Sequence, residues 1–262
     1  MIPVERTTPQ SLSAPELTGH RWIFDLHDPV HAPKVSVVIP TLNEERNIPY
    51  VLSRLPPDLH EVLLVDGRST DQTVPIAKAI RHDVRAIQQD GRGKGNALAC
   101  GFESATGDII AMIDADGSTD PAELPRFVAM LLTGADFAKG TRFVTGGGSH
   151  DLTQLRRMGN RALSLTVNML YRTRYSDLCY GYNAFWRHCL PSLQVDCDGF
   201  EVETLLNIRA ARAGLRVVEV PSFELPRIHG ESNLNAVRDG ARVLKTIVRE
   251  RGRTVGRPQV TA

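Results

Sequence analysis

Two carboxylates follow an apolar segment near the middle of the chain. The run from Ile109 to Ile113 is apolar and mostly branched, Asp114 comes directly after it, and Asp116 stands two positions further on. Such a run predicts a buried strand, and the ligand sites of α/β sheets lie at the carboxyl ends of their strands. Two carboxylates one residue apart share a face of the chain and are able to hold a divalent cation such as Mg2+ or Mn2+.

The same segment has features of other acidic turns. Asp114, Asp116, Ser118 and Asp120 alternate as in a calcium-binding EF-hand loop, but Pro125 stands at the twelfth position, where that loop needs a bidentate Glu. The EF-hand interpretation is therefore disfavoured. A solvated turn without a metal is the other interpretation of the two Asp when they are taken alone.

A second candidate is the glycine-rich run from Gly91 to Gly95. It is not a nucleoside-triphosphate-binding P-loop, which requires four residues between its first Gly and the Gly-Lys pair and then Ser or Thr. It also lacks the third Gly of the dinucleotide-binding fingerprint, because Asn96 stands at that position. The run predicts a glycine turn at the start of a helix, where backbone N–H groups, Arg92 and Lys94 could approach a phosphate.

The composition is that of a globular protein large enough for one domain with a buried core. The 262 residues are 42% hydrophobic and 23% charged, with a net charge of +1. This balance argues against a general nucleic-acid-binding protein, although Arg156, Arg157 and the basic segment from Arg238 to Arg253 could meet phosphates or anionic lipid. The solvated face of a helix is the simpler interpretation of both basic groups.

Cysteine spacing and hydropathy address the cellular compartment. Cys100, Cys179, Cys189 and Cys197 form no CxxC motif, so they predict neither a zinc site nor a redox site. No apolar stretch approaches the roughly 18 residues that span a bilayer, and the first residues do not form a signal peptide. We therefore expect a cytoplasmic protein without a transmembrane anchor, with at most peripheral contact at the inner face of the membrane.

Short apolar segments alternate with amphipathic ones from residue 34 onward. Strands are expected at 34–40, 61–66, 84–88, 109–113, 135–139 and 215–220, and helices at 46–55, 73–80, from the glycine turn to about 105, 161–171, 201–213 and 233–251. This alternation predicts an α/β fold with a mostly parallel sheet and helices on both faces. Asn43, Asp66 and Asp114 then fall at the carboxyl ends of strands.

The chain is expected to comprise three segments. Residues 1–33 contain several Pro and no periodicity, which predicts a flexible N-terminal arm. Residues 34–232 form the expected catalytic domain, and residues 233–262 form a basic C-terminal helix and tail. No internal repeat is present.

With these motifs in order, the chain resembles the family 2 glycosyltransferases, inverting enzymes whose nucleotide-sugar-binding, Rossmann-like fold is called GT-A. The resemblance runs from Val35 to about Ala241 and is carried by VSVVIPTLNEERNI, VLLVDGRSTDQT, GRGKGNAL, IDADGSTDP, KGTRF, SDLCYGYNAFWR, GFEVETLL and PRIHGESNL, in the family's order. The later segments are most similar to the polyprenyl-phosphate branch, which includes dolichyl-phosphate mannosyl- and glucosyltransferases. The resemblance implies metal-dependent transfer of a sugar from a UDP- or GDP-sugar to a polyprenyl phosphate.

The resemblance also implies roles for the residues at matching positions. It assigns the nucleotide and its diphosphate to Pro40, Asn43, Glu44, Asp66 and Lys94, with Ser232 nearby, and assigns the Mg2+ or Mn2+ to Asp114 and Asp116. The Arg after the Gly-Thr pair, Arg142, and the Arg before the His-Gly-x-Ser stretch, Arg227, are implied to contact donor or acceptor phosphate. Arg156 or Arg157 is a further phosphate candidate.

Two departures from the family pattern matter. Asp66 is followed by Gly67, where the family has a second Asp, so one base or ribose contact is missing or is supplied elsewhere, and the choice between UDP and GDP stays open. Many polyprenyl-phosphate transferases carry C-terminal membrane helices, whereas this chain ends in a basic segment. A lipid acceptor would therefore require peripheral contact with the membrane surface.

Leaving-group charge is the main chemical problem of the implied reaction, because C1 of the sugar loses a nucleoside diphosphate while the acceptor attacks from the opposite face. A cation held by the two Asp of the strand end, with Lys94 and an Arg, would stabilise that charge. A phosphate acceptor is already ionised and needs positioning, whereas a hydroxyl acceptor needs a base. Glu201 and Glu203 are the base candidates, with Asp198 behind them, although the helix dipole alone also favours two Glu at a helix start.

Several alternatives stay open beside this prediction. The acceptor could be a hydroxyl of a glycan or small molecule, or the protein could bind a nucleotide-sugar without turnover. A sugar nucleotidyltransferase shares the sheet, but its Gly-rich loop should follow the first strand, where this chain has Pro40 to Glu44. Tyr180, Tyr182 and Trp186 could stack on a sugar ring or pack in the core, and the oligomeric state is not predicted.

Overall fold

The computed structural model describes residues 32–231 and 235–253. Nearly all of the predicted N-terminal arm lies outside these ranges, and so does Ser232. The flexibility of the arm and the role of Ser232 therefore stay predictions.

A seven-stranded sheet with the order β3-β2-β1-β4-β7-β5-β8 forms the centre of the molecule. Its strands are β1 (Val35–Thr41), β2 (Glu61–Asp66), β3 (Val84–Gln88), β4 (Ile109–Met112), β5 (Phe137–Thr141), β7 (Asn183–Trp186) and β8 (Val217–Pro221). Neighbouring strands run parallel except at β7, which is antiparallel to β4 and β5. A separate parallel pair joins β6 (Gly148–Ser149) to β9 (Phe223–Glu224). The predicted mostly parallel α/β sheet is confirmed.

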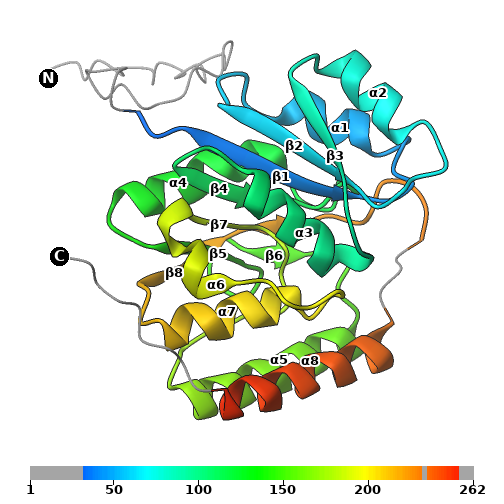
Figure 1. Cartoon of the computed structure of the whole chain (residues 1–262). Coiled ribbons are helices and arrows are strands. Elements are labelled where there is room, and N and C mark those ends of the chain that lie inside the picture. Colours follow the sequence, from blue (N-terminus) through cyan, green and yellow to red (C-terminus); the bar gives the residue numbers. More distant parts are fainter. Residues whose placement is uncertain (1–31, 232–234, 254–262) are drawn as a thin grey trace, which may run out of the picture.

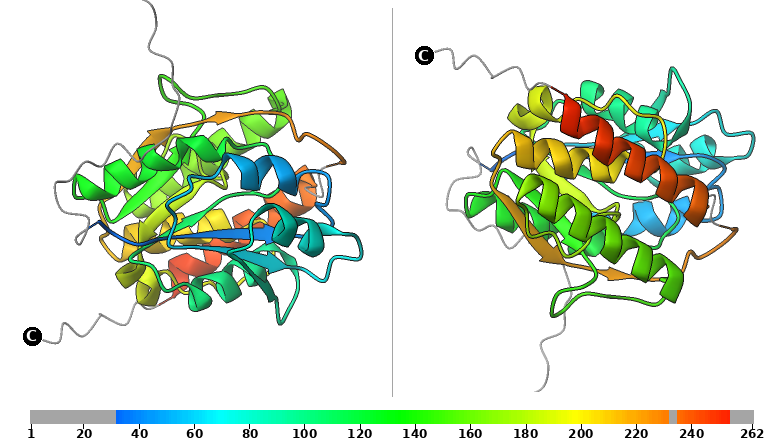
Figure 2. Two further views of the ribbon diagram at one scale, coloured as in Figure 1. Left: turned by 90° about the horizontal axis from the view of Figure 1, so that it is seen from above. Right: turned by 90° about the horizontal axis from the view of Figure 1, so that it is seen from below.

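Helices cover both faces of the sheet (Figure 1). One face carries α1 (Ile48–Arg54), α2 (Thr73–Ile80) and α4 (Leu124–Leu132), and the other carries α3 (Gly93–Ser104), α6 (Leu190–Leu193) and α7 (Val202–Arg212). Short 3-10 helices span Pro121–Glu123 and Arg187–Cys189. Beyond α7 lie α5 (Gln154–Tyr171) and α8 (Ala236–Gly252), which pack side by side as an outer layer in Figures 1 and 2.

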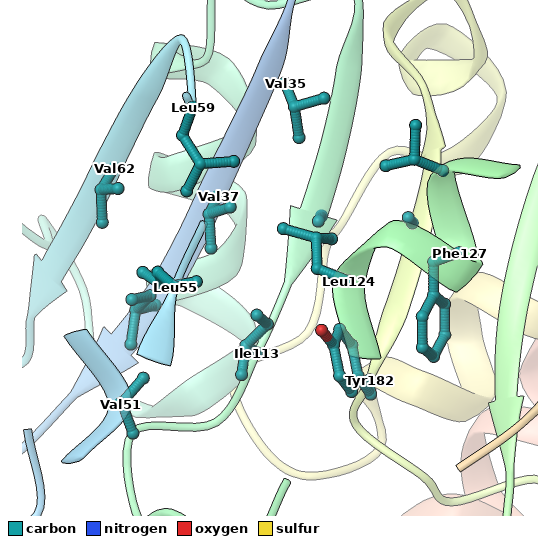
Figure 3. Close-up of a cluster of buried hydrophobic side chains, with 14 of the residues drawn as sticks. Val35, Val37, Val51, Leu55, Leu59, Val62, Ile113, Leu124, Phe127 and Tyr182 are labelled. Atoms are coloured by element: carbon teal, nitrogen blue, oxygen red, sulfur yellow. The ribbon is translucent and has the colours of Figure 1, made fainter. Parts of the chain in front are cut away.

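The first strand shows why the apolar runs of the sequence form this sheet. Val35, Val37 and Ile39 point into the core under α1 and α4, whereas Val38 points into the core under α3 and α7. A strand buried on both faces is apolar at nearly every position, so its sequence shows no alternation, and the one buried serine of this strand, Ser36, donates a hydrogen bond to Glu61. Figure 3 shows part of the first core, in which the Tyr182 ring stacks on Phe127 with ring centroids 4.2 Å apart.

Several predicted boundaries are wrong. The strand expected at 135–139 is β5 at Phe137–Thr141, and the helix expected from 161 begins at Gln154, where the Thr153 side chain accepts a hydrogen bond from the Arg156 N–H. The helix expected from 46 begins at Ile48. The sequence does not predict α4 or β7.

The predicted C-terminal helix is present as α8 and is docked on the domain. Its Val243 and Ile247 are buried against Val167 of α5 and Ile208 of α7. Of the helices in residues 32–231 and 235–253, none combines the length and the apolar character that crossing a bilayer requires. The proposed boundary between the domain and the C-terminal segment falls within the residues that are not described.

The glycine turn is required because two segments of backbone meet at the start of α3. Gly93 has a φ of +81°, and the Gly95 N–H donates to the Asp198 carbonyl at 3.0 Å. A Cβ on Gly95 would lie 2.1 Å from the carbonyl oxygen of Cys197. The run is therefore a close-packing turn, and it fixes the side chain of Lys94 between β4 and α7.

We expect Gly95→Ala to lower the free energy of unfolding by about 1–3 kcal/mol, because overpacking forces the facing backbone to move. The matched control is Gly159→Ala on α5, where an added Cβ meets nothing within 4 Å. That control should raise the free energy of unfolding by up to about 1 kcal/mol through helix propensity. Urea denaturation followed by circular dichroism measures both, and equal effects would contradict the close-packing role.

Candidate functional site

A large cavity lies at the carboxyl ends of β1, β2 and β4. Its volume is about 1120 Å³, and it extends from the strand ends to the N-terminal halves of α5 and α8. Pockets for small molecules commonly measure roughly 300–1,000 Å³, so this one has room for a large ligand or for two. Its position agrees with the general rule for ligand sites of α/β sheets.

Asp114 and Asp116 lie on the floor of this cavity. The strand continues for one residue beyond β4, where the Ile113 N–H donates to the Val38 carbonyl at 3.2 Å. Gly117 then adopts a φ of +74° and turns the chain, and the Asp116 carboxylate accepts from the Ser118 N–H at 3.0 Å. The side chains of the two Asp are 27% and 21% exposed, so both carboxylates are accessible from the cavity.

Lys94 is the counter-ion of Asp114. Its Nζ lies 2.5 Å from Asp114 Oδ1 and 2.7 Å from Glu203 Oε1, so it connects the end of β4 to the start of α7. Burial alone lowers the pKa of Lys94, but the charges of Asp114 and Glu203 outweigh it and hold the pKa above its ordinary value. Lys94 is therefore a fixed cation beside the first Asp.

Arg227 is the counter-ion of Asp116. Its Nε lies 3.5 Å from Asp116 Oδ2, while its two terminal nitrogens donate to both oxygens of Glu44 at 2.9 and 3.1 Å. Asn47 donates to the same Glu44 carboxylate at 2.6 Å and to the His229 carbonyl at 3.1 Å. Burial raises the pKa of Glu44, and the hydrogen bonds from Asn47 and Arg227 act against that rise. These contacts fasten the segment after β9 to the loop after β1.

The donor set fits the predicted Mg2+ or Mn2+. Carboxylate oxygens are the ligands that such cations prefer, and both carboxylates are accessible from the cavity. In the described part of the chain, no three His, Cys, Asp or Glu side chains gather in a metal-binding cluster. Asp114 and Asp116 would therefore supply two ligands and leave the other positions to ligand oxygens or water.

Gly181 keeps the space beside Asp114 open. A Cβ at this position would lie 2.6 Å from Asp114 Oδ2 and 3.0 Å from Lys94 Nζ. Gly181 stands between Tyr180 and Tyr182 and belongs to the cavity lining. Only glycine leaves the second oxygen of Asp114 uncovered.

Arg142 also lines the cavity, and its guanidinium is paired with two carboxylates. Its guanidinium donates to Asp177 at 2.7 and 2.9 Å and to Glu224 at 3.0 Å. Burial alone raises the pKa of Asp177, but the neighbouring Arg142 cation outweighs it and holds that pKa below its ordinary value. Asn160 of α5 donates to the same Asp177 at 3.1 Å. The group joins β5, β9 and α5 into one rigid wall.

The structure brings most of the predicted site residues together. The cavity is lined by Pro40, Glu44, Lys94, Asp114, Asp116, Arg142, Arg156, Asp198, Glu203 and Arg227. Asn43 and Asp66 do not line it: the Asn43 carboxamide accepts from the Thr70 N–H at 2.8 Å, and the Asp66 carboxylate accepts from the Ser69 N–H at 3.1 Å. These two side chains hold the adjoining turns, and their contact with the nucleotide stays a prediction.

The base candidates and the aromatic residues differ in their surroundings, and a catalytic role for Glu201 or Glu203 stays a prediction. Glu203 is 3% exposed and is held by Lys94, and Glu201 lies outside the cavity lining. Tyr182 and Trp186 pack in the core, as the alternative interpretation states. Tyr180 lines the cavity while its hydroxyl lies 2.8 Å from Ser222 Oγ.

Sequence reasoning missed Gly181, Asp177 and Glu224. The first two lie within the segment SDLCYGYNAFWR. This motif was interpreted only through its aromatic residues, although its Asp and its Gly could have indicated the two missed positions. Glu224 stands 82 positions from Arg142 and belongs to none of the quoted motifs. Its pairing has no local signal in the chain.

Comparison with known proteins identifies the family. The pattern of glycosyl transferase family 2 matches residues 36–189. An uncharacterised glycosyltransferase of Mycobacterium tuberculosis is 36% identical over 208 residues, which cover 79% of this chain and 92% of the relative. The undecaprenyl-phosphate mannosyltransferase of Micrococcus luteus is 32% identical over 219 residues, covering 77% and 88% of the two chains.

A solved structure supports the fold. The glucosyl-3-phosphoglycerate synthase of Mycobacterium tuberculosis, in complex with Mn2+, UDP and glucosyl-3-phosphoglycerate, matches with a TM-score of 0.67 and 27% identity. The match covers 86% of this chain and 82% of the synthase. Because the family pattern spans more than half of the sequence and the relatives align over most of it, the chain belongs to glycosyl transferase family 2 and is a glycosyltransferase with the GT-A fold.

Proposed function

We propose that the chain is an inverting, divalent-cation-dependent glycosyltransferase that moves a sugar from a UDP- or GDP-sugar to a polyprenyl phosphate. The observation that carries this proposal is the shape of the cavity. One end holds Asp114 and Asp116 at the end of β4, and the other runs between two helices past apolar side chains. Such a cavity suits a diphosphate donor at one end and a lipid phosphate at the other.

At the donor end, two fixed cations flank the carboxylate pair. Lys94 and Arg227 each contact one Asp, so both would lie beside a diphosphate bound between them. A bound Mg2+ or Mn2+ supplies Lewis-acid stabilisation of the leaving diphosphate. Lys94 and Arg227 add fixed positive charge, and their ion pairs hold them in position before the donor arrives.

At the acceptor end, the lining changes from charged to apolar. Leu155 and Leu163 of α5 and Val237 and Val243 of α8 line this part of the cavity, and Arg156 of α5 lines it as well. A polyprenyl phosphate is ionised at neutral pH, so positioning by an Arg replaces a general base. The absence of a need for a base agrees with the position of Glu203, because its carboxylate forms an ion pair with Lys94.

Relatives with known acceptors support the lipid phosphate. They include the undecaprenyl-phosphate mannosyltransferase described above and a dolichol-phosphate mannosyltransferase of Pyrococcus furiosus, which is 29% identical over 211 residues. The latter alignment covers 77% of this chain and 59% of the relative.

A phosphorylated small molecule with a hydroxyl is the second candidate acceptor. The likeness to the glucosyl-3-phosphoglycerate synthase favours it, because that enzyme was solved with a phosphorylated product. In this case Asp198 is the carboxylate of the cavity lining that is available as a base near α7. The reaction would then depend on Asp198, whereas transfer to a lipid phosphate would not.

The deciding experiment measures nucleoside diphosphate release from UDP- and GDP-sugars with Mg2+ or Mn2+. Each donor is tested alone, with a short-chain polyprenyl phosphate, and with phosphoglyceric acid. We expect release that is stimulated by the polyprenyl phosphate. Stimulation by phosphoglyceric acid alone would select the second candidate, and tight nucleotide binding without release would contradict both.

We expect Asp116→Ala to lower turnover by a factor on the order of 100 or more, because it removes a ligand of the leaving-group cation. The matched control is Asp120→Ala, which removes a carboxylate that pairs with Arg54 and lies outside the cavity. Paramagnetic resonance of Mn2+ with UDP gives a readout that does not depend on turnover. Unchanged Mn2+ binding in Asp116→Ala would refute the metal assignment.

We expect Arg227→Ala to raise the KM for polyprenyl phosphate by about tenfold or more while weakening UDP binding less, because one charge-assisted contact is worth roughly 1.5–3 kcal/mol. Calorimetric titration with UDP measures the second quantity. Since the substitution leaves Glu44 buried without its cation, the double variant Arg227→Ala/Glu44→Gln separates a folding defect from lost phosphate binding. Equal losses for donor and acceptor would limit Arg227 to its place beside the donor diphosphate and leave it no separate role in binding the acceptor phosphate.

A further inference from the structure

The outer faces of α5 and α8 carry apolar side chains that no part of the described structure covers. Seven of the eleven exposed large apolar side chains in the described residues lie on these two helices: Leu155, Met158, Leu165 and Met169 on α5, and Val237, Leu244 and Val248 on α8. They are 48% to 79% exposed. The right-hand view of Figure 2 looks onto this helix-pair face, on which α5 and α8 lie side by side.

The spacing of these residues shows that each helix has a second apolar side. Positions 155, 158, 165 and 169 differ by three, seven and four, and positions 237, 244 and 248 differ by seven and four, so each set forms one stripe along its helix. The opposite sides are already used, since Val167, Val243 and Ile247 pack over α7. A concentration of exposed apolar side chains on one pair of helices is typical of an interaction site.

The charge on the helix-pair face is of one sign. No Asp or Glu occurs in α5, and the two acidic residues of α8, Asp239 and Glu250, are 3% and 1% exposed and pair with Arg side chains. The exposed cations beside the stripes are Arg157, Arg161, Arg238, Arg242, Lys245 and Arg249. The face therefore offers apolar stripes flanked by positive charge, with no exposed acid on either helix.

The apolar stripes and the positive charge together indicate which partner fits the helix-pair face. A second copy of the chain would bring cations against cations, because an isologous contact presents the same face twice. A bilayer with anionic lipids supplies an apolar layer for the stripes and phosphate headgroups for the cations, which is how amphipathic helices lie in a membrane interface.

The helix-pair face is also continuous with the candidate site. Leu155 and Val237 belong both to the exposed stripes and to the cavity lining, and Leu163 and Val243 follow them inward. We propose that this face docks on an anionic bilayer. A lipid phosphate would then pass from the bilayer into the cavity between the two helices, and its hydrocarbon chain would stay in contact with apolar side chains throughout. The use of this surface rests on the proposed lipid acceptor, but docking itself requires no turnover.

The test is co-sedimentation of the full chain with phosphatidylcholine vesicles that contain or lack phosphatidylglycerol. We expect binding to the anionic vesicles that weakens as salt is raised. Leu165→Ser/Met169→Ser should lower the partition coefficient by roughly tenfold or more, because both side chains leave the lipid layer. The matched control, Ile80→Ser, removes an equally large exposed side chain from α2 and should change nothing.

A charge-reversal pair tests the electrostatic part. Arg161→Glu/Lys245→Glu should abolish the preference for phosphatidylglycerol, whereas Lys78→Glu on α2 should keep it. The proposal would be overturned if neither the stripe variant nor the charge-reversal variant changed binding to the anionic vesicles. If the protein forms a dimer without lipid and Leu165→Ser makes it monomeric, the face binds a second copy of the chain. If vesicle binding is seen only after removal of residues 1–31, that segment occupies the face.

Transfer to a short-chain, water-soluble polyprenyl phosphate separates the two proposals. The stripe variants should retain that reaction and lose transfer to long-chain lipid in vesicles. Absent vesicle binding with intact transfer to the short acceptor would refute the docking face alone. Vesicle binding with no transfer to any lipid phosphate would support the docking face and refute the proposed acceptor.

Discussion

The buried ion group of Lys94, Asp114 and Glu203 is the interaction on which the candidate site depends. Its three members come from the starts of α3 and α7 and the end of β4, so one ammonium fixes the relative position of three elements. Burying charges is costly, and removing one partner leaves a buried charge uncompensated, at about 3–5 kcal/mol. The close approach at Gly95 serves the same end, because it sets the depth at which Lys94 lies.

The second ion group, formed by Arg142, Asp177 and Glu224, plays the corresponding part for another portion of the cavity lining. It holds β5, β9 and α5 together through hydrogen bonds of 2.7 to 3.1 Å. Two ionic clusters therefore contribute to the lining of the cavity, and both are formed by the protein before any ligand binds. Preorganised charge of this kind is effective in catalysis because it needs no rearrangement during the reaction.

The sequence predicted the sheet well where a single local signal was sufficient. The apolar residues of Glu61–Asp66 lie between two acidic residues, so this strand can be predicted without information from elsewhere in the chain. The Asp114 and Asp116 pair was predicted from a similar apolar run. Strand β7 was missed because four residues carry too little pattern, and its antiparallel direction depends on how the chain returns to the sheet. The pairing of Lys94 with Asp114 and Glu203, and of Arg142 with Asp177 and Glu224, was not predicted, because the fold alone brings these distant carboxylates to the two cations.

The burial of α7 has a consequence for how this enzyme can change in evolution. Every residue from Val202 to Ala210 is buried, between the sheet on one side and α5 and α8 on the other. A helix packed on all sides tolerates few substitutions, whereas the outer faces of α5 and α8 touch nothing within the described structure. Substitutions on the outside of the helix pair therefore do not disturb Glu203, so the docking surface can adapt to a different acceptor while the donor chemistry is retained.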